Sequence, residues 1–347
     1  MAGEAGDAPA GASVAGSGTA SEADPAAAPG AAPRAHPGTD WRTGRHDGNV
    51  LFLFLDGVGL GEPDPAFNPL VAADLPTIRH GVGAAPDRHA APVTASGRVF
   101  RALDARMGFD GLPQSATGQT ALLTGRNAAE TMGGHYGPWP GPSLHPLLRS
   151  GTLFHDAQGV GGAALANVYP PPFFAQTGRR RSRPNAPLFA ADAAGVPLRA
   201  LPAYRGDAAV PADLDGTFLQ TFDASLAAMG PERSGRVLVK LARAHRFTFL
   251  DVWLTDRYGH ARDQVAARAL LERFDAMLAV VLEFAPGLTV IVTSDHGNLE
   301  DARVKGHTNN DVPLLVFGPG AEAFARARTL MDVAPAVRGL WVSPRTG

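Results

Sequence analysis

Aspartate and histidine occur in this chain at spacings that suit a divalent metal ion. Asp256 and His260 stand four residues apart after an apolar run at 247–254. If this segment is helical, positions i and i+4 lie on one side, so both side chains can reach one ion. Asp56 follows another apolar run and precedes Gly57, which lets the backbone turn closely around a bound group. An aspartate in such a place is about as typical of a turn or a helix cap, so Asp56 alone predicts little.

Two further segments contribute histidine. Asp295 and His296 follow the apolar run 290–294, and because adjacent side chains diverge, they are predicted to serve two centres, or one ion from a bent loop. His307 lies shortly before a run that begins at Pro313, and a lone loop histidine is usually just exposed. Together, three aspartates and three histidines near the ends of predicted strands form a mixed oxygen and nitrogen set that favours Zn²⁺ or Mn²⁺.

Such a metal centre would attract an anion. Two divalent ions carry more positive charge than three aspartates neutralise, which predicts a positive centre in a mildly acidic protein. A phosphate or sulfate ester is the expected guest. A pair of ions can stabilise both the attacking and the leaving oxygen of an in-line displacement. The pattern therefore predicts two divalent ions that serve transfer or hydrolysis of a phosphoryl group.

A nucleophile is predicted in the segment 112–126, which begins with turn-forming residues and continues into an apolar run, as if Ser115 opened a helix. Backbone N–H groups at the start of a helix favour anions and would also favour a serine alkoxide. The alternative is that Ser115 is only an N-cap, and Thr117 has an equal claim to either role. The residues alone leave both interpretations open.

Short apolar runs that alternate with helical patterns must position these groups. The runs read as strands buried on both faces and lie at 49–55, 247–254, 288–293 and 313–317, with a weaker one at 163–168. Leu270, Phe274, Leu278 and Val281 recur at helical spacing and mark one buried face. This alternation predicts an α/β fold, in which ligands gather beyond the carboxyl ends of the strands.

Three regions follow from the composition along the chain. Residues 1–47 are rich in Ala, Gly and Pro and are predicted to be a disordered tail, and residues 48–345 to be a metalloenzyme domain. The pattern breaks down at 169–215, which predicts a small cap insertion. This insertion carries a basic run that we interpret as a clamp for a second anionic group of the substrate or, equally, as a solvated loop. The run consists of Arg179, Arg180, Arg181 and Arg183.

Overall composition excludes several classes of protein. The chain has 347 residues, 45% of them hydrophobic, so it can bury a full core. A net charge of -2 argues against a nucleic-acid partner, and the absence of cysteine excludes disulfides and thiolate metal sites. No secretory signal and no span of about 20 apolar residues is found, so the protein is expected to be cytoplasmic. A small phosphorylated metabolite is the expected partner, and no protein partner is indicated.

Several of these elements together resemble the alkaline phosphatase superfamily, especially its branch of cofactor-independent phosphoglycerate mutase and phosphopentomutase. The resemblance covers about residues 49 to 317. It rests on the pair Asp256 and His260, the element Asp295-His296-Gly297-Asn298, His307-Thr308 before Val312-Pro313, and Thr124-Gly125-Arg126 at a fixed spacing after Ser115.

The resemblance implies a three-layer sandwich with a mostly parallel central sheet, and it selects Ser115 over Thr117 as the nucleophile. It also implies a division of the ligands between two ions: Asp256, His260 and His307 would hold one, and Asp56, Ser115, Asp295 and His296 the other. The expected activity is that of a phosphatase or a phosphomutase acting through a phosphoserine. A catalytically silent phosphate-binding module and a phosphodiesterase are the alternatives, and the residues after Ser115 lack the sulfatase signature.

Overall fold

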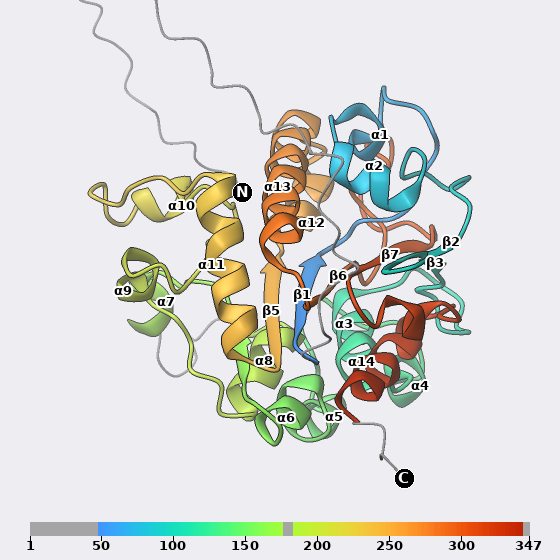
Figure 1. Cartoon of the computed structure of the whole chain (residues 1–347). Helices are drawn as coiled ribbons and strands as arrows, with labels where there is room; N and C mark the ends of the chain where they lie inside the picture. The colour runs from blue at the N-terminus through green and yellow to red at the C-terminus, as the bar shows by residue number, and fades with distance from the viewer. Residues whose placement is uncertain (1–47, 176–182, 343–347) are drawn as a thin grey trace, which may run out of the picture. The chain divides into compact units, whose positions relative to one another are not determined.

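A seven-stranded sheet organises the computed structural model, which describes residues 48–175 and 183–342 (Figure 1). The strands lie side by side in the order β2-β3-β7-β6-β1-β5-β4. Their bounds are β1 Val50–Leu55, β2 Val93–Ala95, β3 Arg98–Leu103, β4 Ala163–Leu165, β5 Phe247–Val252, β6 Thr289–Thr293 and β7 Val312–Phe317. The predicted tail and Arg179, Arg180 and Arg181 lie outside the described residues.

The strands predicted from the apolar runs are confirmed and form the middle of the sheet and one edge. β4, β5, β1 and β6 are parallel neighbours, while β7 is antiparallel to β6. Every residue of β1, β5, β6 and β7 is buried, as expected for continuous apolar runs covered on both faces. The run 247–254 is a strand only as far as Val252, because Leu254 already begins a helix.

The opposite edge, formed by β2 and β3, was not predicted. β3 pairs antiparallel with both β2 and β7, which makes this side of the sheet antiparallel. Its pattern is weak because Arg98 and Arg101 interrupt the apolar residues. In the structure Arg101 donates hydrogen bonds to the backbone oxygens of Val93 and Ala325, so its charge lies at the sheet edge.

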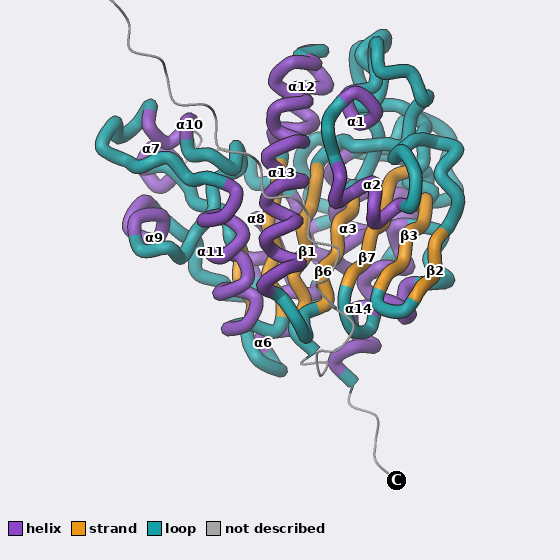
Figure 2. The backbone as a smooth tube through the Cα atoms, turned by 45° about the horizontal axis from the view of Figure 1, so that its top comes forward, coloured by secondary structure: helices purple, strands orange, loops and turns teal. Residues whose placement is uncertain are grey.

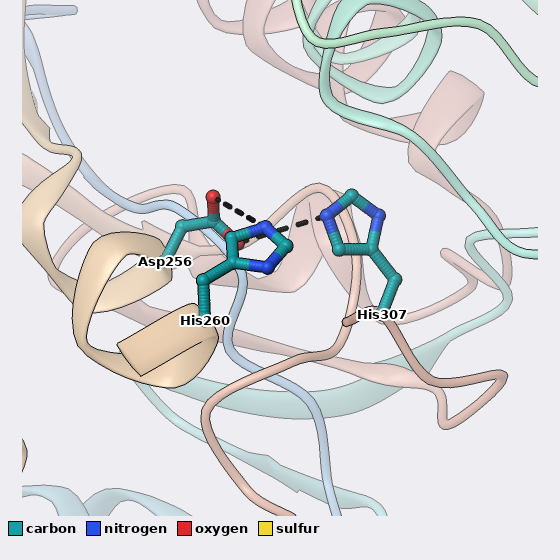
Figure 3. A group of neighbouring side chains, drawn as sticks. All are labelled: Asp256, His260 and His307. Carbon is teal, nitrogen blue, oxygen red and sulfur yellow. Dashed lines mark ion pairs between the residues drawn. The ribbon is translucent and has the colours of Figure 1, made fainter. Parts of the chain in front are cut away.

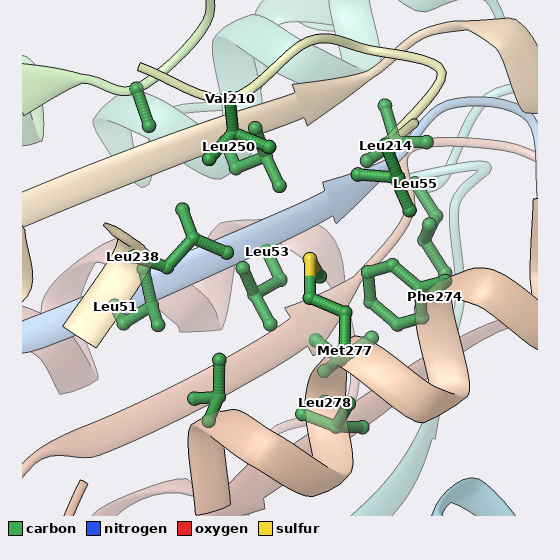
Figure 4. Packing of buried hydrophobic residues seen from close by; sticks show 14 of the residues in the cluster. Leu51, Leu53, Leu55, Val210, Leu214, Leu238, Leu250, Phe274, Met277 and Leu278 are labelled. Atoms are coloured by element: carbon green, nitrogen blue, oxygen red, sulfur yellow. The ribbon is translucent and has the colours of Figure 1, made fainter. Parts of the chain in front are cut away.

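Helices cover both faces of the sheet and give the expected three layers (Figure 2). Successive residues of β1 alternate between two apolar cores, since Leu51 and Leu53 point to one and Phe52 and Phe54 to the other. Figure 4 shows the first core, where α13 packs Phe274 and Met277 near β1. The helices of this core are α1 Pro69–Ala72, α2 Pro76–Val82, α9 Leu201–Arg205, α10 Thr217–Gln220, α11 Pro231–Ala244, α12 Leu254–Ala261 and α13 Gln264–Phe284.

The second core lies on the other face and includes the helix that carries Ser115. Its helices are α3 Ser115–Thr124, α4 Ala128–Met132, α5 His145–Arg149, α6 Leu153–Gln158, α7 Pro171–Ala175, α8 Ala186–Ala193 and α14 Val333–Trp341, with short 3₁₀ turns at Ala321–Phe324 and Leu330–Asp332. Part of the predicted insertion, α8, packs directly on this core. A small cap insertion at residues 169–215 stays a prediction.

The order of the strands explains why distant residues meet. β6, β1 and β5 are adjacent and parallel, so their carboxyl ends lie at the same end of the sheet. These ends are followed by Asp295, Asp56 and Asp256. β7 runs in the opposite direction, so His307, which precedes it, comes to the same end of the sheet. None of the helices in the described residues is long and apolar enough to cross a membrane.

Candidate active site

Ser115 is the first residue of α3, and its hydroxyl faces the aspartates and histidines at the carboxyl end of the central strands. Ser115 Oγ lies 2.9 Å from Nε2 of His296, and Ser115 is only 5% exposed. Gln114, not Ser115, is the N-cap of the helix, and no side chain caps it. Thr117 points elsewhere, because its hydroxyl donates to the backbone oxygen of Gln114 at 3.0 Å. Of the two hydroxyls, only that of Ser115 contacts a predicted metal ligand.

His296 stands at the centre of a fully buried group. Its Nε2 lies 3.4 Å from Oδ1 of Asp56 and 3.6 Å from Oδ2 of Asp295. Its Nδ1 lies 3.4 Å from the backbone oxygen of Gly297, which favours the tautomer with the proton on Nδ1. Nε2 then offers its lone pair to the Ser115 hydroxyl or to a cation. Among the described residues, Oδ1 of Asp56 is buried and has no hydrogen-bond partner, which suits an atom that would bind a cation.

Burial dominates the electrostatics of this group. It raises the pKa of Asp295 to about 7 and that of Asp56 well above its ordinary value, and the nearby carboxylates of Asp295 and Asp256 raise the pKa of Asp56 further. Burial also lowers the pKa of His296 and so favours the neutral imidazole, which is the form that binds metal. Carboxylates crowded together in this way need protons or a cation to be stable.

A second group, more open to solvent, consists of Asp256, His260 and His307 (Figure 3). Asp256 and His260 are on α12, the helix expected from their spacing, and Nε2 of His260 lies 3.4 Å from Oδ2 of Asp256. Nε2 of His307 lies 3.8 Å from Oδ1 of Asp256. His307 Nδ1 is 2.6 Å from the backbone oxygen of Pro113, a contact that orients Nε2 toward the carboxylate. One ligand atom from each residue could contact a single ion.

The two groups are joined through Asp256 and through stacked imidazoles. Asp256 can also share an ion with Asp56 and His296, because ligand atoms of these three residues lie within 4.8 Å of one another. The rings of His296 and His307 stack with centroids 3.8 Å apart. Burial alone would raise the pKa of Asp256, but hydrogen bonds from His260 and Asn298, together with the charge of His296, outweigh it and bring the pKa to about 2. All seven predicted metal ligands therefore gather at one end of the sheet.

Gln119 was missed by sequence reasoning, although it lies one helical turn after Ser115. Its Nε2 donates to Oδ2 of Asp56 at 3.2 Å and to Oδ2 of Asp295 at 3.0 Å. Its Oε1 accepts from the backbone N–H of Ala186 at 3.3 Å, which settles the orientation of the amide. The i+4 position relative to a candidate nucleophile was a signal for it.

Glu300 was missed as well and ties the surrounding loops together. Its buried carboxylate accepts from the backbone N–H groups of Gly59 at 2.9 Å and Asn298 at 2.8 Å, and from the side chains of Thr308 and Asn310. These contacts link the loops that follow β1 and β6 to the segment before β7. Its position just after the Asp-His-Gly-Asn element was the available signal.

Close backbone approach explains two of the glycines. A Cβ atom on Gly118 would lie 2.7 Å from the backbone oxygen of Asp295, so only glycine lets α3 approach this loop. Gly57 has a φ of +67°, and a Cβ there would lie 2.5 Å from Oδ1 of Asp256. Both glycines allow the ligands to come within reach of one another.

Asp251 is a further buried carboxylate near the site that the sequence reasoning missed. It lies on β5 opposite Phe54, and its Oδ2 accepts from Nδ2 of Asn185 at 2.7 Å, while its Oδ1 is buried and has no hydrogen-bond partner within residues 48–175 and 183–342. Asn167 holds its backbone through two hydrogen bonds. Burial raises the pKa of Asp251 to about 7, more than the Asn185 contact lowers it. A charged residue inside an apolar strand was the signal.

Of the four arginines predicted to bind substrate, only Arg183 lies within the described residues. It is exposed, and its guanidinium lies over the ring of Trp139 at 5.8 Å from the centroid. Arg179, Arg180 and Arg181 lie outside the described residues, so the clamp for a second anionic group of the substrate stays a prediction.

Comparison with known proteins places these features in a family context. Residues 223–340 match the family model of the Metalloenzyme superfamily. The matched segment contains Asp256, His260, Asp295, His296 and His307, whereas Asp56 and Ser115 lie before it. A phosphopentomutase of Rhizobium etli is 35% identical over 119 residues, which are 33% of this chain and 27% of that protein. A phosphopentomutase of Methylobacterium radiotolerans is 40% identical over 83 residues, 23% of this chain and 20% of that protein.

Solved structures extend the likeness to most of the chain. A protein of Pyrococcus horikoshii superposes with a TM-score of 0.54 at 14% identity, covering 88% of this chain and 99% of its own. A cold-active alkaline phosphatase from Shewanella sp. gives 0.50 at 14% identity, covering 85% and 100%. At this identity the likeness concerns the fold. The predicted resemblance and the alkaline-phosphatase-like fold are thus confirmed, although the matched segments span about a quarter of the phosphopentomutases or less.

Proposed function

We propose that this chain, which belongs to the Metalloenzyme superfamily over residues 223–340, is a metal-dependent phosphoryl-transfer enzyme, either a phosphomonoester hydrolase or a phosphomutase. The observation that carries the proposal is the position of Ser115, whose Oγ lies 2.9 Å from Nε2 of His296 within a buried group of acids. The likeness to phosphopentomutases supports the same class of chemistry and favours a small sugar phosphate as substrate.

The residues present fit two divalent ions, Mn²⁺ or Zn²⁺. Asp256, His260 and His307 would hold one ion, and Asp56, Asp295, His296 and Ser115 would surround the other. The buried, unpartnered Oδ1 of Asp56 and the mixed set of carboxylates and neutral imidazoles support this assignment. When bound, the ions would supply positive charge that neutralises a phosphoryl group and lowers the pKa of a nearby hydroxyl.

In this reaction Ser115 Oγ gives up its proton and forms a bond to phosphorus, while the ester oxygen leaves with its electron pair and takes up a proton. The product is a phosphoserine and the free alcohol of the substrate. Water then takes the phosphoryl group in a phosphatase, and a second hydroxyl takes it in a mutase. The contact with His296 holds the nucleophile in place, and the start of α3 directs backbone N–H groups toward the incoming anion.

The test is phosphoryl transfer by the full chain, measured with added Mn²⁺ or Zn²⁺. Phosphate release from a panel of monoesters reports hydrolysis, interconversion of positional isomers reports a mutase, and mass spectrometry locates a phosphoserine. We expect Ser115→Ala to abolish both turnover and the modification. Thr117→Ala removes a hydroxyl two residues away and serves as the matched control, which should keep both.

Three results would overturn the proposal. Turnover that survives Ser115→Ala would exclude this serine as the nucleophile. Tight, metal-dependent binding of vanadate without turnover or phosphoserine for any ester would favour the alternative, a catalytically silent binding module. Cleavage of diesters in preference to monoesters would favour the phosphodiesterase.

A further inference from the structure

A loop at residues 133–140 passes over the first turn of the helix that carries Ser115. The N–H of Thr117 donates to the backbone oxygen of Tyr136 at 3.1 Å, and the N–H of Tyr136 donates to Oγ1 of Thr117 at 3.3 Å. A Cβ on Gly137 would lie 3.2 Å from the backbone nitrogen of Ser115. These contacts fix the backbone of the loop directly beside the candidate nucleophile.

The same loop presents aromatic surface to solvent. Tyr136 is 40% exposed and Trp139 is 45% exposed, although each ring would be more stable away from water. The guanidinium of Arg183 lies over the Trp139 ring, 5.8 Å from its centroid, and this cation–π contact orients both groups. Within residues 48–175 and 183–342, no carboxylate forms an ion pair with Arg183. Its charge is therefore available to a ligand.

Arg183 reaches this place through the segment that begins α8. Asn185, two residues later, donates to Asp251, and the N–H of Ala186 donates to Oε1 of Gln119, one turn after Ser115. Trp139 and Arg183 thus come from two segments that are both anchored to α3. One segment contacts its first turn and the other its second, so both are held beside the helix that begins with Ser115.

We propose that Trp139 and Arg183 form the subsite for the leaving group of the substrate and that they favour phosphate esters of cyclic sugars over open-chain esters. This inference rests on the proposed phosphoryl-transfer function. The flat apolar face of a sugar ring can stack on the indole, while the guanidinium donates hydrogen bonds to ring hydroxyls or to a second anionic group. An open-chain ester such as glycerol phosphate lacks a face that covers the ring.

The test compares kcat and KM of the metal-loaded full chain for a cyclic sugar phosphate and for glycerol phosphate. Trp139→Ala should raise KM for the cyclic ester about tenfold, as loss of an aromatic stacking partner does elsewhere. KM for glycerol phosphate should change less than about twofold, because that ester makes no stacking contact. Trp139→Phe keeps an aromatic face and should restore most of the affinity. Arg183→Ala should raise KM in the same selective way.

Phe218→Ala is the matched control, since Phe218 is also an exposed aromatic, at 43%, but belongs to α10 on the other face of the sheet. It should change neither constant. Equal effects of Trp139→Ala on both esters, or a loss confined to kcat, would overturn the subsite and assign the loop a purely structural role.

A fluorescence measurement separates failure of the subsite from failure of the proposed function. The chain has four tryptophans, so binding of the cyclic sugar phosphate to the Ser115→Ala variant should change an emission that Trp139→Phe removes. That change would support the subsite even if Ser115 were not the nucleophile. An emission change that persists in the double variant Ser115→Ala, Trp139→Phe would contradict it.

Discussion

The two groups of metal-ligand candidates contain the same residue types but differ in burial. The side chains of Asp295 and His296 are fully buried, whereas that of His260 is 46% exposed. The pKa of Asp295 is raised to about 7, chiefly by burial, while hydrogen bonding to His260 helps to bring that of Asp256 to about 2. In the open group a histidine already offsets the carboxylate charge.

This difference indicates separate tasks for the two groups. The buried carboxylates are stable only with a proton or a cation, so an ion there would be held by a strong local need for positive charge. The open group satisfies part of its charge by itself and lies closer to solvent, so it should exchange its ion more readily. Ser115, the proposed nucleophile, contacts the buried group.

The largest effect is expected for His296→Ala, because His296 contacts Ser115 and two carboxylates at once. We expect kcat/KM for a phosphate monoester to fall roughly 10³- to 10⁴-fold. His89→Ala, on an exposed loop, is the control and should remain near wild type. Circular dichroism checks that the variant is folded. A folded His296→Ala protein within tenfold of wild type would remove the buried group from catalysis.

The second largest effect is expected in the pH dependence of stability, because the carboxyl of Asp251 is buried near the site. The pKa of Asp251 is about 7 in the folded chain and near 3.8 when unfolded, so the folded state holds an extra proton between these values. Its stabilising effect is complete below pH 4 and is lost as the pH rises toward 7. This change amounts to on the order of 4 kcal/mol for one carboxyl.

Asp251→Asn should therefore flatten the fall in unfolding free energy over that range. Urea denaturation of chelator-treated protein between pH 4 and pH 7.5 measures it, with Asp110→Asn at an exposed carboxylate as the control. Parallel curves for wild type and Asp251→Asn would show that burial does not raise this pKa.

A smaller effect is expected in the open group. His260→Ala removes one ligand from a partly exposed site, and we expect affinity for one divalent ion to fall about 10- to 100-fold. Excess metal should restore most of the turnover, unlike in His296→Ala. Calorimetric titration of the metal-free chain with Mn²⁺ and with Zn²⁺ measures the affinity. The distinction between the two groups fails if His260→Ala and His296→Ala respond alike to added metal.

The smallest effect is expected for Thr117→Val, which removes a hydroxyl from the same helix turn as Ser115. The variant loses the hydrogen bond that the hydroxyl donates to the backbone oxygen of Gln114 and the one that it accepts from the N–H of Tyr136, which should cost about 1 kcal/mol of unfolding free energy. Turnover should stay within about threefold of wild type, because this hydroxyl does not face the metal ligands. Thermal unfolding together with initial rates provides both numbers. A large loss of turnover at unchanged stability would reopen Thr117 as the nucleophile.

Local pattern was sufficient for the central strands and for the long helix. The run 50–55 is apolar throughout because both faces of β1 are covered, and Leu270, Phe274 and Leu278 recur because α13 buries one side. β2 and β3 were not predicted because β2 has only three residues and because Arg98 and Arg101 interrupt the apolar pattern of β3. Residue types at strand ends, with the family resemblance, were enough to nominate the candidate ligands.

Tertiary structure alone decided which of these residues meet and what supports them. The order β6-β1-β5, with β7 reversed, brings four distant segments to the same end of the sheet. No local pattern in the sequence encodes this strand order. Gln119, Asp251 and Glu300 act through partners 67, 66 and up to 241 residues away, so their contacts exist only after folding. Ser115 and Thr117 look equivalent along the chain. The direction in which α3 enters the site turns one hydroxyl toward His296 and the other toward the backbone.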